Sequence, residues 1–278
     1  MSINTQTVGL KRNTIDKYYT NPSVVSKCIR QIKQYINIEH NDLIIEPSAG
    51  NGSFINELQT LSTNCLFYDL KPEHLSIDKQ DYLLLDTAPI SNIYPKIHIV
   101  GNPPFGRQSS MAIKFIKKST LFCNSISFIL PKSFKKDSMQ KHFPLDFHLI
   151  FEEDVEENGF LVDGNVYDVH CVFQIWEKKE VKREKEEKLI PNGFQFVKKY
   201  ENPDIAFRRV GVYAGNVYKD ISTKSEQSHY FIKFDKKIPE STFEELNAIV
   251  FASRDNTVGP RSISKPELME QYNTIVLE

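Results

Sequence analysis

Apolar residues up to about residue 176 occur at two kinds of spacing. Short, continuous apolar runs predict buried strands over residues 43–45, 65–68, 97–100 and 125–130. Apolar residues three and four positions apart predict helices over residues 22–36, 54–61 and 109–120. Two further runs, 147–151 and 169–176, predict a last pair of strands joined by an irregular stretch over 152–167. Strands that alternate with helices predict an α/β fold with a doubly wound, Rossmann-like sheet.

The periodicity changes after a dense run of charged residues at 177–188. A solvated linker (178–188) or an exposed helix is the natural interpretation of such a run. Beyond it, two short strands over 207–213 and 229–234, connected through 214–216, precede a helix over 242–252. We therefore expect a main domain over residues 1–178 and a small β-rich appendage over 189–278.

Composition agrees with this division. The chain has 278 residues, of which 40% are hydrophobic, enough for one large domain with a small appendage. Its four cysteines are scattered, each in an apolar run, which predicts buried free thiols in a reducing compartment rather than disulfides or a metal site. No apolar run approaches the length of a membrane span, and the N-terminus has no signal-peptide core. We expect a cytoplasmic protein, or one at another intracellular site such as a virus factory.

The charge of the chain neither favours nor excludes binding to nucleic acid. The net charge of −1 argues mildly against strong nonspecific binding to nucleic acid, but it does not describe how the charges are distributed. Solvated faces explain most clusters of basic residues, and we expect a minority of them in a nucleic-acid groove. The clusters are Lys114, Lys117 and Lys118; Lys132, Lys135, Lys136 and Lys141; Arg208 and Arg209; and Lys233, Lys236 and Lys237.

A stiff turn follows the predicted strand at 97–100, where Asn102, Pro103, Pro104 and Phe105 come directly after a glycine. Two successive prolines fix φ and remove two backbone donors, so nearby carbonyls are free to face a ligand. Asn102 offers a side-chain oxygen, Pro103 a carbonyl and Phe105 a flat apolar face. These groups suit an exocyclic amine on a planar ring. A rigid loop without chemistry remains the alternative for this turn taken alone.

A loop of small residues links the predicted strand at 43–45 to the helix at 54–61. Two glycines allow close approach of the backbone, and the helix N-terminus presents free N–H groups to a ligand. The loop lacks the third glycine of a dinucleotide fingerprint and the lysine of a P-loop, so it is a weak signal alone. Its residues are Glu46, Pro47, Ser48, Ala49, Gly50, Asn51 and Gly52.

Two acids follow in an order that fits a nucleoside-containing ligand. Asp69, with Leu70 after it, ends the strand at 65–68 about twenty residues beyond the glycine loop, where an acid can accept ribose hydroxyls. Asp81 precedes Tyr82, and its carboxylate can accept an adenine amino group beside a flat side chain. Each acid alone can be an ordinary turn residue. The ordered set of glycine loop, two acids and Asn-Pro-Pro-Phe turn is much harder to explain by accident.

With this set of motifs the chain resembles the S-adenosylmethionine-dependent amino-methyltransferases that carry an Asn/Asp-Pro-Pro-Tyr/Phe motif, in particular the N6-adenine nucleic-acid methyltransferases. The resemblance covers roughly residues 14–178. It implies a class I methyltransferase sheet, S-adenosylmethionine as cofactor and no metal. The glycine loop then holds the methionine side of the cofactor, residues 102–105 form the catalytic turn, and residues 14–22, including Tyr19 and Thr20, contact the cofactor. The chain departs from the commonest form at Glu46, where many members have Asp, and at Phe105, where many have Tyr.

The resemblance also implies a nucleic-acid partner, and we expect DNA rather than RNA. Lys132 and Phe134 would lie on the target-base side, as in the related enzymes. Basic and aromatic residues alternate in the appendage and suit phosphate contact and base stacking, although a plain hairpin explains them equally well. These residues are Arg208, Arg209, Tyr213, His229 and Tyr230. The alternative substrates are RNA adenines, including cap-adjacent ones, and the glutamine amide of release factors, because a primary amide presents the same N–H₂ geometry.

Overall fold

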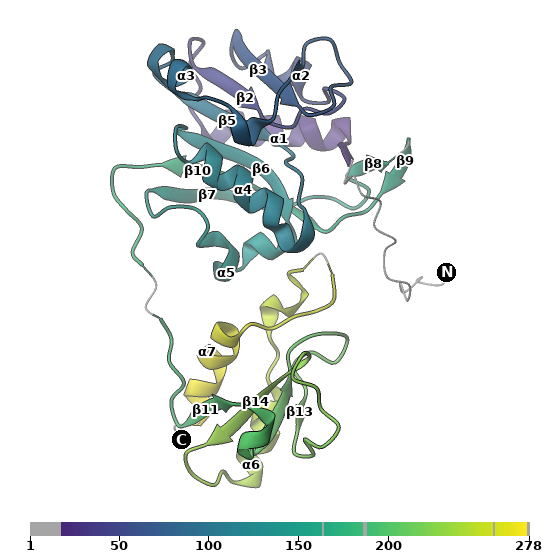
Figure 1. The fold of residues 1–278 in the computed structure, drawn as a ribbon, viewed down its shortest axis with the longest axis vertical. Coiled ribbons are helices and arrows are strands. Elements are labelled where there is room, and N and C mark those ends of the chain that lie inside the picture. The colour runs from purple at the N-terminus through teal and green to yellow at the C-terminus, as the bar shows by residue number, and fades with distance from the viewer. Residues whose placement is uncertain (1–17, 163, 186–187, 258, 277–278) are drawn as a thin grey trace. The chain divides into compact units, whose positions relative to one another are not determined.

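The structure is a computed structural model that describes residues 18–276 except 163, 186, 187 and 258. Within these residues a seven-stranded sheet has the order β4-β3-β2-β5-β6-β10-β7 (Figure 1). The pairs β4–β3, β3–β2, β2–β5 and β5–β6 are parallel. The expected α/β class is therefore confirmed. The strands are β2 (Leu43–Glu46), β3 (Asn64–Asp69), β4 (Asp78–Lys79), β5 (Ile97–Gly101), β6 (Ser125–Pro131), β7 (Phe147–Asp154) and β10 (Cys171–Lys178).

Several helices of this part bury apolar residues. The helix α1 (Pro22–Tyr35) begins where the sequence predicts, because Asn21 caps it by accepting from the Ser23 N–H and Pro22 occupies its first position. Val24, Val25, Cys28, Ile29 and Ile32 form its buried face. The other α-helices of this part are α2 (Ile55–Leu58), α3 (Ala88–Ile93), α4 (Ser110–Ser119) and α5 (Asp137–Gln140). Short 3-10 helices are η1 (Tyr82–Leu84), η2 (Arg107–Ser109) and η3 (Lys132–Lys135).

Two predictions for this part are wrong in detail. The helix predicted over 54–61 is a single turn, α2, because the backbone bonds beyond it tighten: Thr60 N–H donates to Glu57 O and Leu61 N–H to Leu58 O, three residues back instead of four. The stretch 152–167, predicted as irregular, contains the strands β8 (Phe160–Val162) and β9 (Asn165–Tyr167). These strands form a second sheet of order β1-β8-β9 with β1 (Tyr19–Thr20), in which Thr20 lies opposite Phe160. Strands β8 and β9 pair with each other, Val162 opposite Asn165, across an Asp-Gly pair that is a hairpin signal in the sequence, whereas β1 depends on a partner about 140 positions away.

The C-terminal part contains a four-stranded sheet of order β11-β14-β12-β13. Its strands are β11 (Phe194–Val197), β12 (Ile205–Arg208), β13 (Val217–Tyr218) and β14 (His229–Phe234), and its α-helices are α6 (Glu240–Ala248) and α7 (Lys265–Ile275). The 3-10 helices η4 (Lys199–Glu201) and η5 (Ala252–Asp255) complete it. The two helices help to bury Phe194, Phe207, Ile232 and Tyr272 in one core. The β-rich expectation holds, but β12 ends at Arg208 rather than at 213, because residues 211–214 form a turn closed by Ala214 N–H to Gly211 O.

The chain divides into two compact units. One comprises the described residues up to Leu130, together with His142–Val169 and Phe173–Glu180. The other comprises Pro131–Lys141, His170–Val172 and the described residues from Val181 onward. The segment Pro131–Lys141 belongs to the second unit through Lys136, whose ammonium group donates to Ser262 O at 2.7 Å and lies 3.2 Å from the Glu267 carboxylate.

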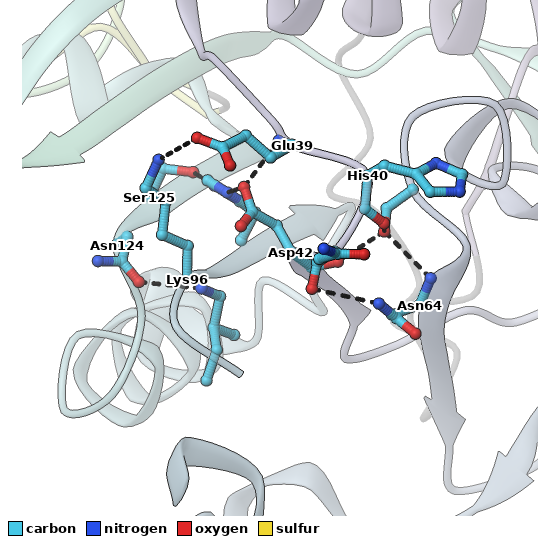
Figure 2. A network of polar contacts seen from close by, with 11 residues as sticks. Glu39, His40, Asp42, Asn64, Lys96, Asn124 and Ser125 are labelled. Carbon is cyan, nitrogen blue, oxygen red and sulfur yellow. Dashed lines mark hydrogen bonds and ion pairs between the residues drawn. The ribbon is translucent and has the colours of Figure 1, made fainter. Parts of the chain in front are cut away.

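A buried polar network ties the amino ends of three central strands together (Figure 2). The imidazole of His98 on β5 lies 3.2 Å from Asp42 Oδ2 through Nε2 and 2.7 Å from Ser125 Oγ through Nδ1. Asp42 also accepts from the Glu39 N–H at 2.8 Å. Burial lowers the pKa of His98, so the ring is neutral and donates one N–H to Asp42. The network sits at the opposite ends of these strands from the cavity described below.

No helix in the described part of the chain is both long and apolar enough to span a membrane.

Candidate functional site

A cavity of about 510 Å³ opens at the carboxyl ends of β2, β3 and β5. This is the edge of a parallel sheet where open α/β folds bind ligands. The cavity lies within the first unit, and both predicted motifs and both predicted acids reach it. Its lining residues are Tyr18, Tyr19, Pro47, Ser48, Gly50, Asp69, Leu70, Lys71, Glu73, Gln80, Asp81, Tyr82, Leu83, Asn102, Pro103, Pro104, Phe105, Gly106, Met111 and Phe115.

The glycine loop is fastened to the end of β3. Gly50, at a φ of +54°, donates its N–H to Asp69 Oδ2 at 2.8 Å, and Ala49 N–H donates to Tyr68 O at 2.9 Å. Asp69 Oδ1 accepts a second backbone N–H, from Lys71, at 2.7 Å. A carboxylate has about four lone-pair sites, so Asp69 keeps acceptor capacity for a ligand while it shapes the loop.

Asp81 and Tyr82 both line the cavity, but Asp81 keeps an oxygen unpaired within the described part of the chain, whereas Tyr82 is packed into the core. Asp81 Oδ1 caps η1 by accepting the Leu83 N–H at 2.9 Å, and no described residue bonds its other oxygen. Tyr82 is buried, with its hydroxyl 2.7 Å from Ser119 Oγ and its ring stacked on Phe115 at a centroid distance of 5.4 Å. Tyr82 therefore forms part of the core as well as the cavity wall.

The Asn-Pro-Pro-Phe turn begins at a strained position. Gly101 has a φ of +147°, and a Cβ there would lie 3.1 Å from Glu46 Cγ, so only glycine fits without a shift. At the other end of the turn, Phe105 O accepts from Met111 N–H at 3.0 Å and from Ala112 N–H at 3.3 Å, which joins the turn to the start of α4. The turn is thus fixed at both ends.

The side-chain amide of Asn102 has a defined orientation. Its Nδ2 donates to Tyr18 O and to Thr20 Oγ1, each at 3.3 Å, and its own backbone oxygen accepts from Ser48 Oγ at 3.1 Å. A backbone carbonyl can only accept, so the nitrogen and not the oxygen must face Tyr18. Among the described residues no group donates to Asn102 Oδ1 or to Pro103 O.

Glu46 lies directly behind this turn. Its side chain is 2% exposed, and its Oε2 is buried with no hydrogen-bond partner among the described residues. Burial, and then the nearby Asp69 carboxylate, raise the pKa of Glu46 to about 8. Glu46 is therefore a neutral carboxylic acid at neutral pH.

The cavity contains groups that the sequence pattern does not identify, among them Glu73, which contacts the predicted residue Tyr19. Tyr19 donates its hydroxyl to the Glu73 carboxylate, with oxygen distances of 2.8 and 2.7 Å, and a Cβ on Gly50 would lie 3.5 Å from the Tyr19 ring. Lys71 and Met111 also line the cavity. Glu73 lies in the loop between β3 and β4, where no spacing or motif marks it, and its contact with Tyr19 spans 54 positions. Only the three-dimensional structure identifies this pair.

Several predicted site residues lie elsewhere. Thr20, Glu46, Ala49 and Gly52 do not line the cavity, and residues 14–17 of the predicted cofactor segment lie outside the described part of the chain. All the predicted substrate residues apart from Phe105 belong to the second unit: Lys132, Phe134, Arg208, Arg209, His229 and Tyr230. Phe134 is 0% exposed, so its ring is not available to stack on a base.

Most of the basic and aromatic residues predicted to bind nucleic acid make contacts within the second unit, whereas Tyr213 is 64% exposed. Arg208 donates to Val210 O at 2.7 Å and to Ser228 Oγ at 3.1 Å, and Arg209 donates to Gln227 O at 2.7 Å. His229 is buried, and burial lowers its pKa. Tyr230 packs parallel to Phe207 and donates to Ile263 O at 3.3 Å. These contacts correspond to the hairpin alternative considered from the sequence.

Comparisons with known proteins give weak similarities. No protein-family model matches the chain. Protein ENHANCED DOWNY MILDEW 2 of Arabidopsis thaliana is 24% identical over 182 residues, which cover 60% of this chain and 13% of that protein. The chain thus spans about 13% of the length of this curated relative.

Solved structures resemble the chain in part. A modification subunit assigned to a type I restriction enzyme of Vibrio vulnificus has a TM-score of 0.45 at 13% identity, covering 80% of this chain and 60% of that one. The 23S rRNA methyltransferase ErmE has a TM-score of 0.44 at 13% identity, covering 61% of this chain and 73% of that one. A candidate RNA methyltransferase of Pyrococcus horikoshii has a TM-score of 0.43 at 15% identity, covering 62% and 92%. Likenesses this weak give no residue-by-residue correspondence with the cavity.

Proposed function

We propose that the chain is an S-adenosylmethionine-dependent methyltransferase that methylates the N6 amine of adenine in nucleic acid, with DNA as the preferred substrate. One observation carries the proposal: a single cavity joins the Gly50 loop, Asp69 and Asp81 to the unoccupied acceptors of Asn102 and Pro103. The acids suit a nucleoside-containing cofactor. The two acceptors suit a primary amine beside it.

The residues of the cavity fit this cofactor. A volume of about 510 Å³ lies in the range of small-molecule sites. Three acidic side chains, Asp69, Glu73 and Asp81, line it against one basic side chain, Lys71, so the lining favours a ligand of net positive charge. When bound, S-adenosylmethionine supplies an electrophilic methyl group on a positively charged sulfur. Asp69 would accept the ribose hydroxyls with its remaining lone pairs, and Asp81 would accept the adenine amino group with its uncapped oxygen.

The turn supplies the groups that a reacting amine needs. Asn102 Oδ1 and Pro103 O would each accept one N–H of the target amine, and Phe105 would offer its ring as a stacking surface to the base. The amine of adenine is a poor nucleophile because its lone pair is drawn into the ring. Two acceptors favour a tetrahedral nitrogen, and they stabilise the amine more strongly once it carries positive charge, which is the condition for accelerating the reaction rather than tightening binding. Asn102 is not a base at neutral pH, so it would hold the amine without removing its proton.

The same geometry supports a substrate with a primary amine or amide N–H₂ group. An adenine must leave its stack to place N6 beside Asn102, and Phe105 would replace part of the lost stacking. RNA adenine and a protein glutamine amide present the same N–H₂ group to the two acceptors, so they remain alternative substrates. DNA, RNA and a peptide with a central glutamine should therefore be tested side by side.

Radiolabelled S-adenosylmethionine with the full chain tests the proposal. We expect label on DNA, recovered after digestion as N6-methyladenine. Asn102→Ala should bind the cofactor normally in calorimetry yet lose single-turnover methyl transfer by about 100-fold or more, the size expected for one lost acceptor in a transition state. Asn41→Ala, a change at an exposed asparagine outside the cavity, is the matched control.

Three outcomes decide between the possibilities. No cofactor binding by the full chain would refute the methyltransferase proposal. Transfer to RNA or to the glutamine peptide, with none to DNA, would retain the methyltransferase and replace its substrate. Single-turnover rates for Asn102→Ala within a few-fold of wild type would show that the turn is only structural.

A further inference from the structure

One short strand holds the side-chain amide of Asn102. Tyr18 O, directly before β1, and Thr20 Oγ1, at its end, each accept from Asn102 Nδ2 at 3.3 Å. They are separated from Asn102 by 84 and 82 positions, so the tertiary fold alone creates this arrangement. The pairing of Thr20 with Phe160 on β8 fixes the strand in turn.

The Thr20 hydroxyl is buried and contacts Asn102. Thr20 is 4% exposed and does not line the cavity, so its hydroxyl is directed at protein rather than at a ligand. Its Oγ1 has Asn102 Nδ2 as its partner among the described residues. The arrangement indicates that the Thr20 hydroxyl acts on Asn102 rather than on a ligand.

We propose that Thr20 is a positioning residue that orients the Asn102 amide so that its oxygen, and not its nitrogen, faces the target amine. The proposal rests on the proposed function and adds a role that differs from the cofactor contact expected for Thr20 from the sequence. Oxygen and nitrogen of an amide are nearly equal in size, so sterics alone does not choose between the two orientations. Hydrogen-bond partners make the choice.

The opposite orientation of the Asn102 amide is unfavourable on both sides. A rotated amide would bring Asn102 Oδ1 against Tyr18 O, two acceptors with no proton between them, and would present N–H groups to the N–H groups of the target amine. The two acceptors, Tyr18 O and Thr20 Oγ1, prevent this by pairing both N–H groups of Nδ2 at once. Without the Thr20 hydroxyl, Tyr18 O would pair one N–H group and leave the other unpaired in a part-buried place. The correct orientation would then be less populated, not abolished.

Thr20→Val tests the role with little change of shape. Valine is also β-branched, so β1 should persist, and it differs only where the hydroxyl becomes a methyl. We expect the single-turnover rate at saturating cofactor to fall about fivefold to tenfold, the effect of one neutral hydrogen bond, while the dissociation constant of S-adenosylmethionine stays within twofold of wild type. Thr20→Ser keeps the hydroxyl and should recover most of the rate. Thr63→Val, which removes a hydroxyl that donates to His40 O, is the matched control.

A double-mutant cycle separates positioning from direct contact. If Thr20 acts through Asn102, adding Thr20→Val to Asn102→Ala should not lower the residual single-turnover rate further. If Thr20 instead contacts the cofactor, Thr20→Val should weaken cofactor binding in both backgrounds. The second result would overturn the proposal, as would an unchanged rate for Thr20→Val.

A spectroscopic measurement does not depend on activity. In protein labelled with ¹⁵N-asparagine, the side-chain N–H₂ resonances of Asn102, assigned by their loss in Asn102→Ala, should shift in Thr20→Val and exchange faster with water. Thr63→Val should leave them in place. Resonances unchanged by Thr20→Val would refute the role of Thr20. If Thr20→Val gives the expected shifts but the wild-type chain binds no cofactor, only the proposed function is refuted.

Discussion

Glu46 makes the stability of the first unit depend on pH in an unusual direction. Its pKa is raised to about 8 from an ordinary value of 4.5, mainly by burial. Between these two values the folded chain holds a proton that the unfolded chain has released. The free energy of unfolding should therefore fall as the pH rises through this window, by up to about 1.4 kcal/mol for each pH unit and by at most about 5 kcal/mol in all. This contribution is fully present below pH 4.5 and is lost as the pH rises through 8.

Glu46→Gln removes this dependence, because glutamine has the shape of the neutral acid and does not ionise. The free energy of unfolding of the variant, measured relative to that of wild type, should be higher at pH 8 than at pH 5. Between these pH values the variant's free energy of unfolding should change less than that of wild type. Urea unfolding monitored by fluorescence suits the measurement, because Trp176 is the single tryptophan and is buried in the first unit. Glu180→Gln, at an exposed position, is the control. Parallel pH curves for wild type and Glu46→Gln would refute a neutral, buried Glu46.

Two further predictions concern groups at opposite ends of the strands. Asp69→Ala should weaken binding of S-adenosylmethionine by about 1–3 kcal/mol in calorimetry, because the ribose loses an ionised acceptor and the Gly50 and Lys71 N–H groups lose their partner; unchanged affinity would refute the assignment. The free energy of unfolding should fall less steeply below about pH 6.5 in His98→Gln than in wild type, because a histidine whose pKa is lowered by burial binds its proton more readily in the unfolded chain. The same fall with decreasing pH in both proteins, measured by urea unfolding, would contradict this.

Local signals were sufficient for the elements that carry the cavity. The run at 97–100 ends at a glycine and two prolines, and β5 ends at Gly101. The helix predicted from residue 22 has a capping asparagine and a proline at its start, and α1 begins at Pro22. Strand tips in a parallel sheet share one edge, so the order of motifs along the chain predicted which residues would share a site. The cavity lining contains twelve of the predicted cofactor and catalytic residues, and which of them contact a ligand stays a prediction.

Non-local contacts set the limit of the sequence interpretation. The strand β1 has two residues and depends on the hairpin β8–β9 about 140 positions later, so no window of sequence contains both partners. The helix α7 was missed although Ser264 and Glu267 form a capping box at its start, a signal that the sequence does contain. The alternation of basic and aromatic residues in the C-terminal part fits both nucleic-acid binding and packing within the domain, for a physical reason. Arg209 lies over the Tyr230 ring at 5.5 Å, and the same chemistry that binds a nucleic acid also packs a small domain.

The choice of asparagine at position 102 brings the cavity and β1 into one argument. An aspartate has two equivalent oxygens and needs no orientation, whereas an asparagine presents an acceptor to the substrate only if its nitrogen is held elsewhere. The Tyr18 carbonyl, 3.3 Å from Asn102 Nδ2, would repel a carboxylate oxygen in the same place, so this scaffold favours the amide. An amide also avoids adding a charge to a cavity that Asp69, Glu73 and Asp81 already make acidic. The strand that restricts the Asn102 amide to one orientation is thus as much a part of the proposed chemistry as the turn itself, and the response of Thr20→Val is the measurement on which that inference depends.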